Sequence, residues 1–409
     1  MFRAGALYFS IVIALFIAVI TSSLLLLAGH YRNTYLKELR FTRLLSNLDS
    51  GQAFALAQNN SLDTIQKVDL YGDGIDSLVI LKREWGIYEQ VQLQTFIQKD
   101  TLTRAMLIGT ETDSVVLYLS DEDRPLSLGG KTKVFGNVLI PKSGIKKAYV
   151  DGKAYRHERL VNDGEIKYSA RLLPKLDTLL VERLKASFKE KYNYTVLTEA
   201  PVHQSFLKPT LYFDVSVKKR LEKASFSGNI IIRSDSALTI SKSCKLNGIQ
   251  IYAPTIIVES GFEGNCQLFA IDSLIIKEKV HLSYPSVAAV LKTANSGAFP
   301  NIILGKTVRF EGIIFTHEQK RSALQTMVSL DSAVNVKGEV YSTGMLKLAE
   351  AVVIDGKATC NRFMMQTKQV LYENFLIDLT LNRNARSRYY LSSPVFNTKL
   401  PNQVLKWLN

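Results

Sequence analysis

The stretch VNVKGEVYSTGMLKLAEAVVIDGKA (334–358) alternates apolar and polar residues, and it carries two glycines in similar frames. Gly338 lies in V-x-G-x-V, and Gly356 follows eighteen residues later in I-x-G-x-A. Alternation with a period of two is typical of strands that bury one face. An interval of this size accommodates three short strands of about 5–6 residues each. The pattern predicts a parallel β-solenoid, in which each layer buries the apolar face of the next.

The same pattern of alternating residues and glycines recurs in other parts of the chain. Residues 134–138 form another V-x-G-x-V frame, and similar frames surround Gly152 and Gly164. Residues 226–282 contain short apolar runs separated by turn-forming residues, and 302–315 add one more pass. Glycine supplies the positive φ or the close backbone approach that sharp corners between such strands need. The fold class expected is therefore mainly β, with a β-solenoid as its largest part.

Residues 61–125 have a different pattern, which predicts an antiparallel β meander. Alternating runs flank Gly72-Asp73-Gly74, a good hairpin signal. Asp69, Asp73 and Asp76 raise the possibility of a calcium loop, but Tyr71 occupies a position where an oxygen ligand is needed. A tight turn explains both the glycines and the aspartates.

One helix interrupts the predicted strands. Leu176, Leu180, Leu184 and Phe188 recur at four-residue spacing after Pro174, which predicts a helical insertion.

The N-terminal stretch predicts a membrane anchor. Residues 6–29 contain no charge, and a run of this length exceeds the roughly 20 residues that cross a bilayer core as a helix. A cleaved signal peptide is the alternative, with a cut near Thr21-Ser22-Ser23, but Leu24 to Leu27 continue the apolar run past it. We expect a retained anchor.

The predicted helix continues beyond the anchor. Phe41, Leu44, Leu45 and Leu48 follow the spacing of an amphipathic helix, which gives one helix from about 6 to 58. This half-apolar, half-amphipathic helix resembles the N-terminal stem of type IV pilins and pseudopilins. Those proteins carry a Glu near the start of the apolar segment, and this chain has none there. The resemblance implies a component of a pilus- or secretion-type machine; an ordinary anchor followed by a membrane-proximal helix is the alternative.

The orientation in the membrane has two readings. Arg3 precedes the apolar run, whereas Arg32, Lys37, Arg40 and Arg43 follow it, and this charge distribution alone favours a cytoplasmic C-terminal part. Long domains, however, translocate largely regardless of charge. We expect a single-pass protein of the bacterial inner membrane with the bulk of the chain in the periplasm, and the cytoplasmic alternative stays open.

The repeated glycine frames carry a second resemblance. Frames of the V-x-G-x-V type at intervals near eighteen, over 126–170 and 226–360, are similar to the rungs of bactofilins, the polymer-forming β-solenoid proteins of bacteria. The helical insertion and the long N-terminal region depart from that family. The resemblance implies self-association through the solenoid.

These patterns divide the chain into six predicted segments. They are a transmembrane anchor (1–30), an amphipathic membrane-proximal helix (31–60), an antiparallel β region (61–125), first solenoid-like rungs with a helical insertion (126–225), a β-solenoid (226–371) and a C-terminal cap or tail (372–409).

The composition limits the classes of protein that remain. Hydrophobic residues make up 46% of the 409, which excludes wholesale disorder. The formal net charge of +14 favours contact with anionic surfaces or polymers. Cys244, Cys266 and Cys360 form no C-x-x-C pair, so we predict buried thiols, with a disulfide between the first two left open.

No enzyme motif is recognisable in the sequence. It has no G-x-S-x-G, no G-x-x-x-x-G-K-[ST] and no H-E-x-x-H, so we predict no catalytic residue, cofactor, metal site or small-molecule substrate. A β-helix carbohydrate-active enzyme, a polysaccharide lyase or hydrolase, is the alternative that the predicted fold suggests. Its acids would come from Asp235, Glu259, Glu263 and Asp272. The five histidines, which are scattered, are His30, His157, His203, His281 and His317.

The C-terminal segment holds the only candidate binding residues. Arg383, Arg386 and Arg388 lie beside Tyr389 and Tyr390, a mixture that can bind phosphate or stack on bases and sugars. A polyanion- or DNA-binding envelope module is thus a further alternative, while a segment that caps the last open strand is the structural explanation. The function predicted from the whole sequence is a non-enzymatic, membrane-anchored structural or assembly protein of the cell envelope. Its expected partners are the membrane, through residues 6–29, and other proteins or further copies of itself.

Overall fold

The computed structural model describes residues 4–57, 65–72, 74, 76–190, 192–195, 200–293, 296, 299–321, 324–367 and 370–408. It confirms a mainly β protein that begins with a long apolar helix. The chain forms two compact units. Unit 1 comprises residues 1–82 and 91–104, and unit 2 comprises residues 83–90 and 105–409.

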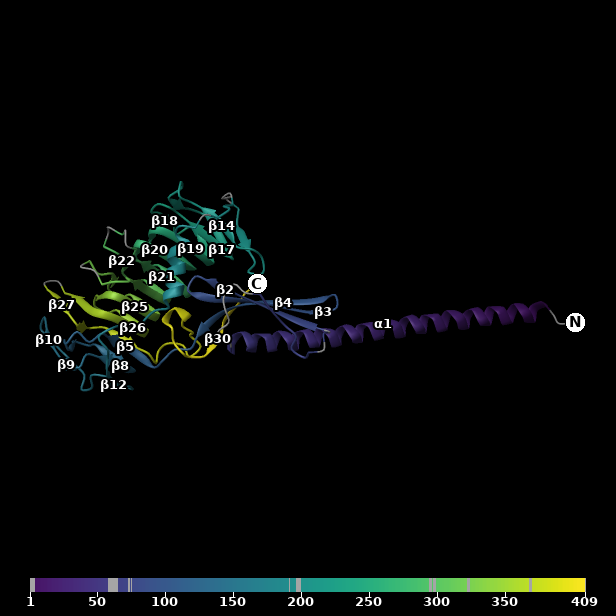
Figure 1. The fold of residues 1–409 in the computed structure, drawn as a ribbon, viewed down its shortest axis with the longest axis horizontal. Helices are drawn as coiled ribbons and strands as arrows, with labels where there is room; N and C mark the ends of the chain where they lie inside the picture. Colours follow the sequence, from purple (N-terminus) through teal and green to yellow (C-terminus); the bar gives the residue numbers. More distant parts are fainter. Residues whose placement is uncertain are drawn as a thin grey trace. The chain divides into compact units, whose positions relative to one another are not determined.

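The N-terminal helix is continuous, as the sequence predicts (Figure 1). α1 (Ala4–Ala57) has 54 residues, and no proline interrupts it. Its side chains from 5 to 39 are almost all exposed, and its buried positions begin only with Leu44. The helix therefore has two halves. The first is apolar and makes almost no contact with the rest of the chain, whereas the second is amphipathic and packs against other residues of unit 1.

Five strands form one antiparallel sheet in the order β1-β2-β3-β4-β30. They are β1 (Ile65–Val68), β2 (Asp76–Trp85), β3 (Tyr88–Ile97), β4 (Asp100–Thr110) and β30 (Asn402–Leu408). The predicted first hairpin is confirmed, with Ile65 opposite Leu81. The Asp69 carboxylate accepts hydrogen bonds from the backbone N–H groups of Tyr71, Gly72 and Gly74, as expected of a tight turn. Asp73 lies outside the described residues.

Within unit 1, the second half of α1 is fixed by packing and by charge. Leu44 and Leu48 are buried. Arg43 donates to the buried Asp76 at 2.5 Å, and Arg40 donates to Asp100 at 2.7 Å. Gly51 lies so close to Leu78 that a Cβ would require the leucine to move. This half of the helix is thus an integral part of unit 1.

Most other strands lie in unit 2 and pair in parallel, in an arrangement whose pairings close on themselves. They are β5 (Val115–Leu119), β7 (Lys133–Phe135), β8 (Asn137–Ile140), β12 (Ile166–Tyr168), β13 (Val202–Gln204), β14 (Leu211–Asp214), β15 (Arg220–Leu221), β16 (Ser225–Gly228), β17 (Ile230–Arg233), β18 (Leu238–Ile240), β19 (Lys245–Val258), β20 (Glu263–Ile276), β21 (His281–Leu291), β22 (Asn301–Leu304), β23 (Arg309–His317), β24 (Met327–Leu330), β25 (Asn335–Leu348), β26 (Val353–Gln366), β27 (Leu371–Glu373) and β29 (Thr380–Asn382). Among these, β27 pairs with β26 in the antiparallel sense.

The two glycines of the stretch 334–358 pair directly with each other. Gly338 lies opposite Gly356 in the β25–β26 register, and Gly312 of β23 lies opposite Gly338. All three have positive φ, and a Cβ on Gly356 would overlap the carbonyl oxygen of Gly338. The glycine frames therefore repeat because successive strands stack in register at a position where the backbones approach closely.

Alternate side chains of these strands form one continuous apolar core. Phe226, Phe262 and Phe310 are fully buried in it, along with a column of valine, leucine and isoleucine side chains from strand after strand. Each strand covers the apolar side chains of its neighbours, so no strand buries its own core face without the next.

The predicted antiparallel region ends earlier than residue 125. β5 pairs in parallel with β8 and with β26, because its valine and leucine side chains complete the core of the parallel strands. The C-terminal segment also differs from a simple cap. β29 pairs in parallel with both β26 and β7, so it lies between late and early strands and satisfies hydrogen-bonding groups on both.

The remaining elements of unit 2 are short. The helical insertion is present as α2 (Thr178–Ser187), which Asp177 caps by accepting from the N–H groups of Leu179 and Leu180. The other elements are β6 (Leu126–Gly129), β9 (Ile145–Lys147), β10 (Tyr149–Val150), β11 (Lys153–Ala154), β28 (Phe375–Ile377) and the 3-10 helix η1 (Pro394–Phe396).

Candidate functional site

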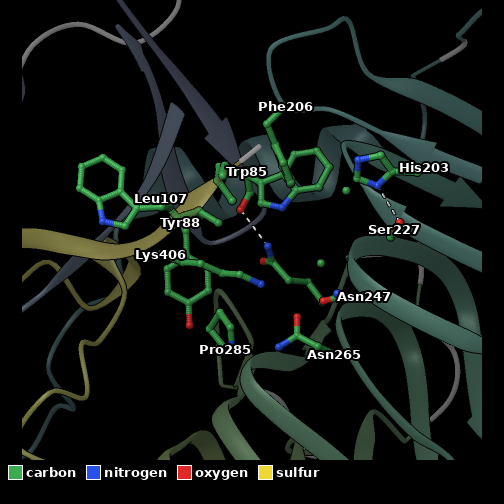
Figure 2. Close-up of a pocket in the computed structure, with 15 residues that line it drawn as sticks. Trp85, Tyr88, Leu107, His203, Phe206, Ser227, Asn247, Asn265, Pro285 and Lys406 are labelled. Atoms are coloured by element: carbon green, nitrogen blue, oxygen red, sulfur yellow. Dashed lines mark hydrogen bonds between the residues drawn. The ribbon is translucent and has the colours of Figure 1, made fainter. Parts of the chain in front are cut away.

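Unit 2 contains a cavity of about 360 Å³ that the sequence does not reveal (Figure 2). Its lining comes from four segments: the end of the β2–β3 hairpin, Leu107 of β4, the strands from β13 to β21 with the residues between them, and the C-terminal strand β30. Its volume lies within the range of about 300–1,000 Å³ that is common for ligand pockets.

One wall of the cavity is a column of polar side chains. His203, Ser227, Asn247 and Asn265 occupy paired positions of β13, β16, β19 and β20. Parallel pairing places them about 4.8 Å apart from strand to strand. His203 Nδ1 lies 2.8 Å from Ser227 Oγ, and Asn265 Nδ2 donates to the backbone carbonyl of Ser283 at 2.8 Å. The register of the strands therefore fixes a strip of amide and hydroxyl groups.

Gln267 holds the opposite segment in place. Its Oε1 accepts from the N–H of Ile87 at 3.1 Å, and its Nε2 donates to the carbonyl of Trp85 at 3.0 Å. The buried amide replaces the backbone partners that the hairpin end lacks. Gly86 has positive φ, and any Cβ there would overlap the Gln267 amide. Both polar atoms of Gln267 are thus used for structure.

The facing wall is mostly apolar and aromatic. Trp85 and Phe206 pack edge to face with ring centroids 5.1 Å apart, and both are largely buried. Tyr88, Leu107 and Pro285 extend this surface. Figure 2 shows the indole nitrogen of Trp85 on the side of the cavity. The cavity thus combines a polar strip with a flat apolar wall.

A single lysine provides the fixed charge of the cavity. Lys406 of β30 extends its ammonium group toward Asn247 and Asn265 in Figure 2, and the amide oxygen of Asn265 points back into the cavity. Among the described lining residues there is no carboxylate. The site is therefore suited to a polar ligand that is neutral or negatively charged.

The five binding residues predicted from the sequence do not form one surface. Arg386 and Tyr390 are buried, with the guanidinium 4.3 Å from the ring centroid, and Arg383 is half-buried, with its Nε donating to the carbonyl of Asp113. Only Arg388 and Tyr389 are exposed together. Polyanion binding stays a prediction. Of the five residues, Arg388 and Tyr389 are the two that are exposed and could contact such a ligand.

Arg386 has a structural partner in the core. Its Nη1 lies 3.4 Å from Oε1 of Glu339, and Ser392 donates to Oε2 of the same carboxylate at 2.9 Å. Burial raises the pKa of Glu339, while the nearby guanidinium acts in the opposite direction. Removing either member would leave a charge in the core without its partner.

The acids of the alternative enzyme hypothesis have separate partners. Asp235 pairs with Arg233 at 2.8 Å, Glu259 pairs with Arg220 at 2.8 Å, and Asp272 accepts from Ser296 at 3.0 Å. Glu263 is exposed at the start of β20. Among the described residues, no group of three or more histidine, cysteine or acidic side chains could hold a metal ion.

The cysteines are free and buried, as predicted for thiols that act as small apolar side chains. Burial raises the pKa of Cys244, Cys266 and Cys360, which keeps all three as thiols at neutral pH.

The N-terminal apolar helix is consistent with a membrane anchor or a signal sequence by its length and hydropathy. No protein-family model matches the chain, and no curated protein matches it. Among solved structures, the chain is distantly similar to the competence-associated pilin ComZ from Thermus thermophilus. The identity is 10%, the match covers 85% of this chain and 87% of that chain, and the TM-score is 0.23. None of these comparisons supports the bactofilin resemblance.

Proposed function

We propose that this chain is a membrane-anchored structural or assembly protein of the cell envelope, with a pilin-like helix and without enzymatic activity. The observation that carries the proposal is the division of α1 into two halves. Leu15, Phe16 and Leu26 are among many large apolar side chains exposed in its first half, whereas Leu44 and Leu48 are buried in its second.

The exposed half needs an apolar environment. A contiguous apolar surface of this extent is unusual on a protein that stays in water, and it marks a membrane or a protein interface. Because the helix satisfies its own backbone hydrogen bonds, it can cross a bilayer without further partners. Membrane insertion is the simplest explanation that accounts for the absence of charge between residues 6 and 29.

The packed half distinguishes this helix from a flexible tether. Arg40 and Arg43 pair with acids of the unit 1 strands, and Gly51 permits close packing against Leu78. A single rigid helix that both inserts and packs on an antiparallel sheet is the arrangement that the pilin resemblance implies. It supports a role in which helices of several copies associate, as in a pilus- or secretion-type machine.

We further infer that the parallel strands of unit 2 form a β-solenoid. Successive long strands pair in parallel in register, and Gly338 and Gly356 stack at the eighteen-residue interval. Such a stack presents an extended, stiff surface to a partner or to another copy. We infer that this part faces the periplasm from the bacterial inner membrane.

Cysteine crosslinking along α1 tests the assembly proposal in cells. Single substitutions at Leu15, Ile17, Val19, Leu24 and Leu26 place a thiol on each side of the exposed half, and the native cysteines are buried and will not compete. Association of helices predicts crosslinked dimers for substitutions on one face and not for those on the other. Membrane-bound protein without crosslinks at any of the five positions would reduce the helix to a simple anchor.

A protease test addresses the compartment. Protease added to spheroplasts should digest unit 2 if the bulk of the chain is periplasmic, and a tag on the N-terminus should survive. Protection of unit 2 in intact spheroplasts, with digestion after lysis, would place it in the cytoplasm instead.

A further inference from the structure

We propose that the cavity shown in Figure 2 binds a uronic-acid residue of an acidic polysaccharide. The proposal concerns a surface of unit 2 and does not depend on how α1 is anchored. It goes beyond the structural role proposed above, because it assigns the protein a ligand.

The polar strip supplies the groups that sugar hydroxyls need. Asn247 is exposed, and its side chain has no hydrogen-bond partner among the described residues. The Asn265 amide uses its nitrogen on Ser283, so its oxygen remains available as an acceptor toward the cavity. Amide groups donate and accept, which matches hydroxyl groups that do both.

The opposite wall suits the apolar face of a pyranose ring. Trp85, Tyr88 and Phe206 provide aromatic surface next to Leu107 and Pro285. Trp85 adds a donor, since its indole nitrogen lies on the side of the cavity. Pockets that bind small ligands typically combine such apolar walls with a few placed polar groups.

The charge of the cavity selects an acidic sugar. Lys406 reaches toward the polar strip, and no carboxylate lines the cavity among the described residues. A sugar carboxylate there would form a charge-assisted hydrogen bond with the ammonium group. The expected ligand therefore has ring hydroxyls for the amides and one carboxylate for the lysine.

Gln267 explains why the site is preformed. Because both ends of its amide bind the backbone at Trp85 and Ile87, the aromatic wall is fixed relative to the polar strip before any ligand arrives. A preformed cavity lowers the ordering cost of binding.

The test uses the full chain in lipid nanodiscs and isothermal titration calorimetry with three probes: trigalacturonate, neutral cellotriose and an acidic peptide, triglutamate. We expect trigalacturonate to bind more tightly than cellotriose by roughly tenfold or more, because only the former offers a carboxylate to Lys406. Triglutamate should bind more weakly than trigalacturonate, because it lacks the hydroxyl groups.

Lys406→Gln should remove the preference for trigalacturonate over cellotriose and leave cellotriose binding unchanged. Lys399→Gln is the matched control, since Lys399 is an exposed lysine of the same C-terminal segment and does not line the cavity. Asn247→Trp should fill the cavity and abolish binding of both saccharides. Thermal unfolding of each variant verifies that the fold is intact.

Several results would overturn the proposal. They are failure of the unmodified protein to bind trigalacturonate, equal effects of Lys406→Gln and Lys399→Gln, and undiminished binding in a folded Asn247→Trp protein. Triglutamate binding as tight as that of trigalacturonate would assign the cavity to acidic peptides instead of saccharides.

Discussion

Residues 5–29 of α1 and strands β19–β26 are both rich in aliphatic side chains, yet the helix exposes them and the strands bury them. The difference lies in the pattern. The helix is apolar on every side, so no single face can pack while another faces water. The strands alternate, and each places only every second side chain in the shared core. Unit 2 therefore stabilises itself, whereas the first half of α1 depends on its surroundings.

The largest effect that distinguishes the two regions is expected at the stacked glycines. Gly356→Val would force a side chain into the carbonyl oxygen of Gly338 at a positive φ, and we expect a loss of more than about 4 kcal/mol in the free energy of unfolding. Chemical denaturation of the full chain in detergent measures it. Gly248→Ala is the control, because its Cβ would meet no atom within 4 Å, and it should cost about 1 kcal/mol. Equal losses for both would show that the strands do not stack closely at Gly356.

A charge in the apolar half of α1 should affect location and leave folding unchanged. Ile17→Arg places a cation in the middle of the exposed apolar run, at a cost to insertion of about 3 kcal/mol. Fractionation with carbonate washing should show part of the protein released from the membrane, while the denaturation midpoint of unit 2 stays the same. Full retention of Ile17→Arg in the membrane would argue against a spanning helix.

Acid should weaken unit 2 through His317. Burial, aided by Lys185, lowers the pKa of this imidazole to about 4, so the folded protein favours the neutral ring. Its stabilising contribution is complete above the unfolded pKa of about 6.5 and is lost as the pH falls from there toward 4. Over that window the unfolding free energy of the native protein should fall by about 2–3 kcal/mol more than that of His317→Gln. A native-like slope in His317→Gln would contradict the assignment.

The smallest expected difference comes from the same substitution in both regions. Ile314→Val removes a methylene from the fully buried core and should cost about 1 kcal/mol, whereas Ile17→Val, at an exposed helix position, should change the unfolding free energy by about zero. Denaturation curves of the two variants measure the contrast. A measurable loss for Ile17→Val would mean that the apolar half of α1 packs against protein.

Local patterns explain which features could be predicted from the sequence. The uncharged run at 6–29 and the glycine frames at 338 and 356 are periodic signals, so the helix and the parallel strands could be recognised. The cavity could not be predicted, because it depends on the hydrogen bond between Gln267 and a hairpin end 180 residues away in the sequence. No local pattern in either segment indicates that the two segments are in contact. The pairing of β30 with β4 likewise joins two segments that lie far apart in the sequence, so no local pattern predicts it.

The predicted binding residues show the same limit. Arg386 appears in a basic, tyrosine-rich segment that looks exposed, but its partner Glu339 lies 47 residues earlier in a strand. Glu339 precedes the core residue Val340, at a position where alternation predicts an outward side chain, so its strand gives no signal of a buried ion pair. Composition alone does not distinguish an arginine that binds a ligand from one that neutralises such an acid.

Disulfide trapping of the strand register tests the central claim, that the strands of unit 2 stack in parallel around the paired glycines. Lys337 lies opposite Asp355, and neighbouring Cα atoms at about 4.8 Å fall within the range that a disulfide spans. The parallel register predicts that Lys337→Cys/Asp355→Cys forms an intramolecular disulfide on oxidation, detected by mass spectrometry of the digested chain. Lys337→Cys/Val353→Cys, with the second cysteine opposite Asn335 instead, should form little. A higher yield in the second variant, or no disulfide in the first, would contradict the parallel register.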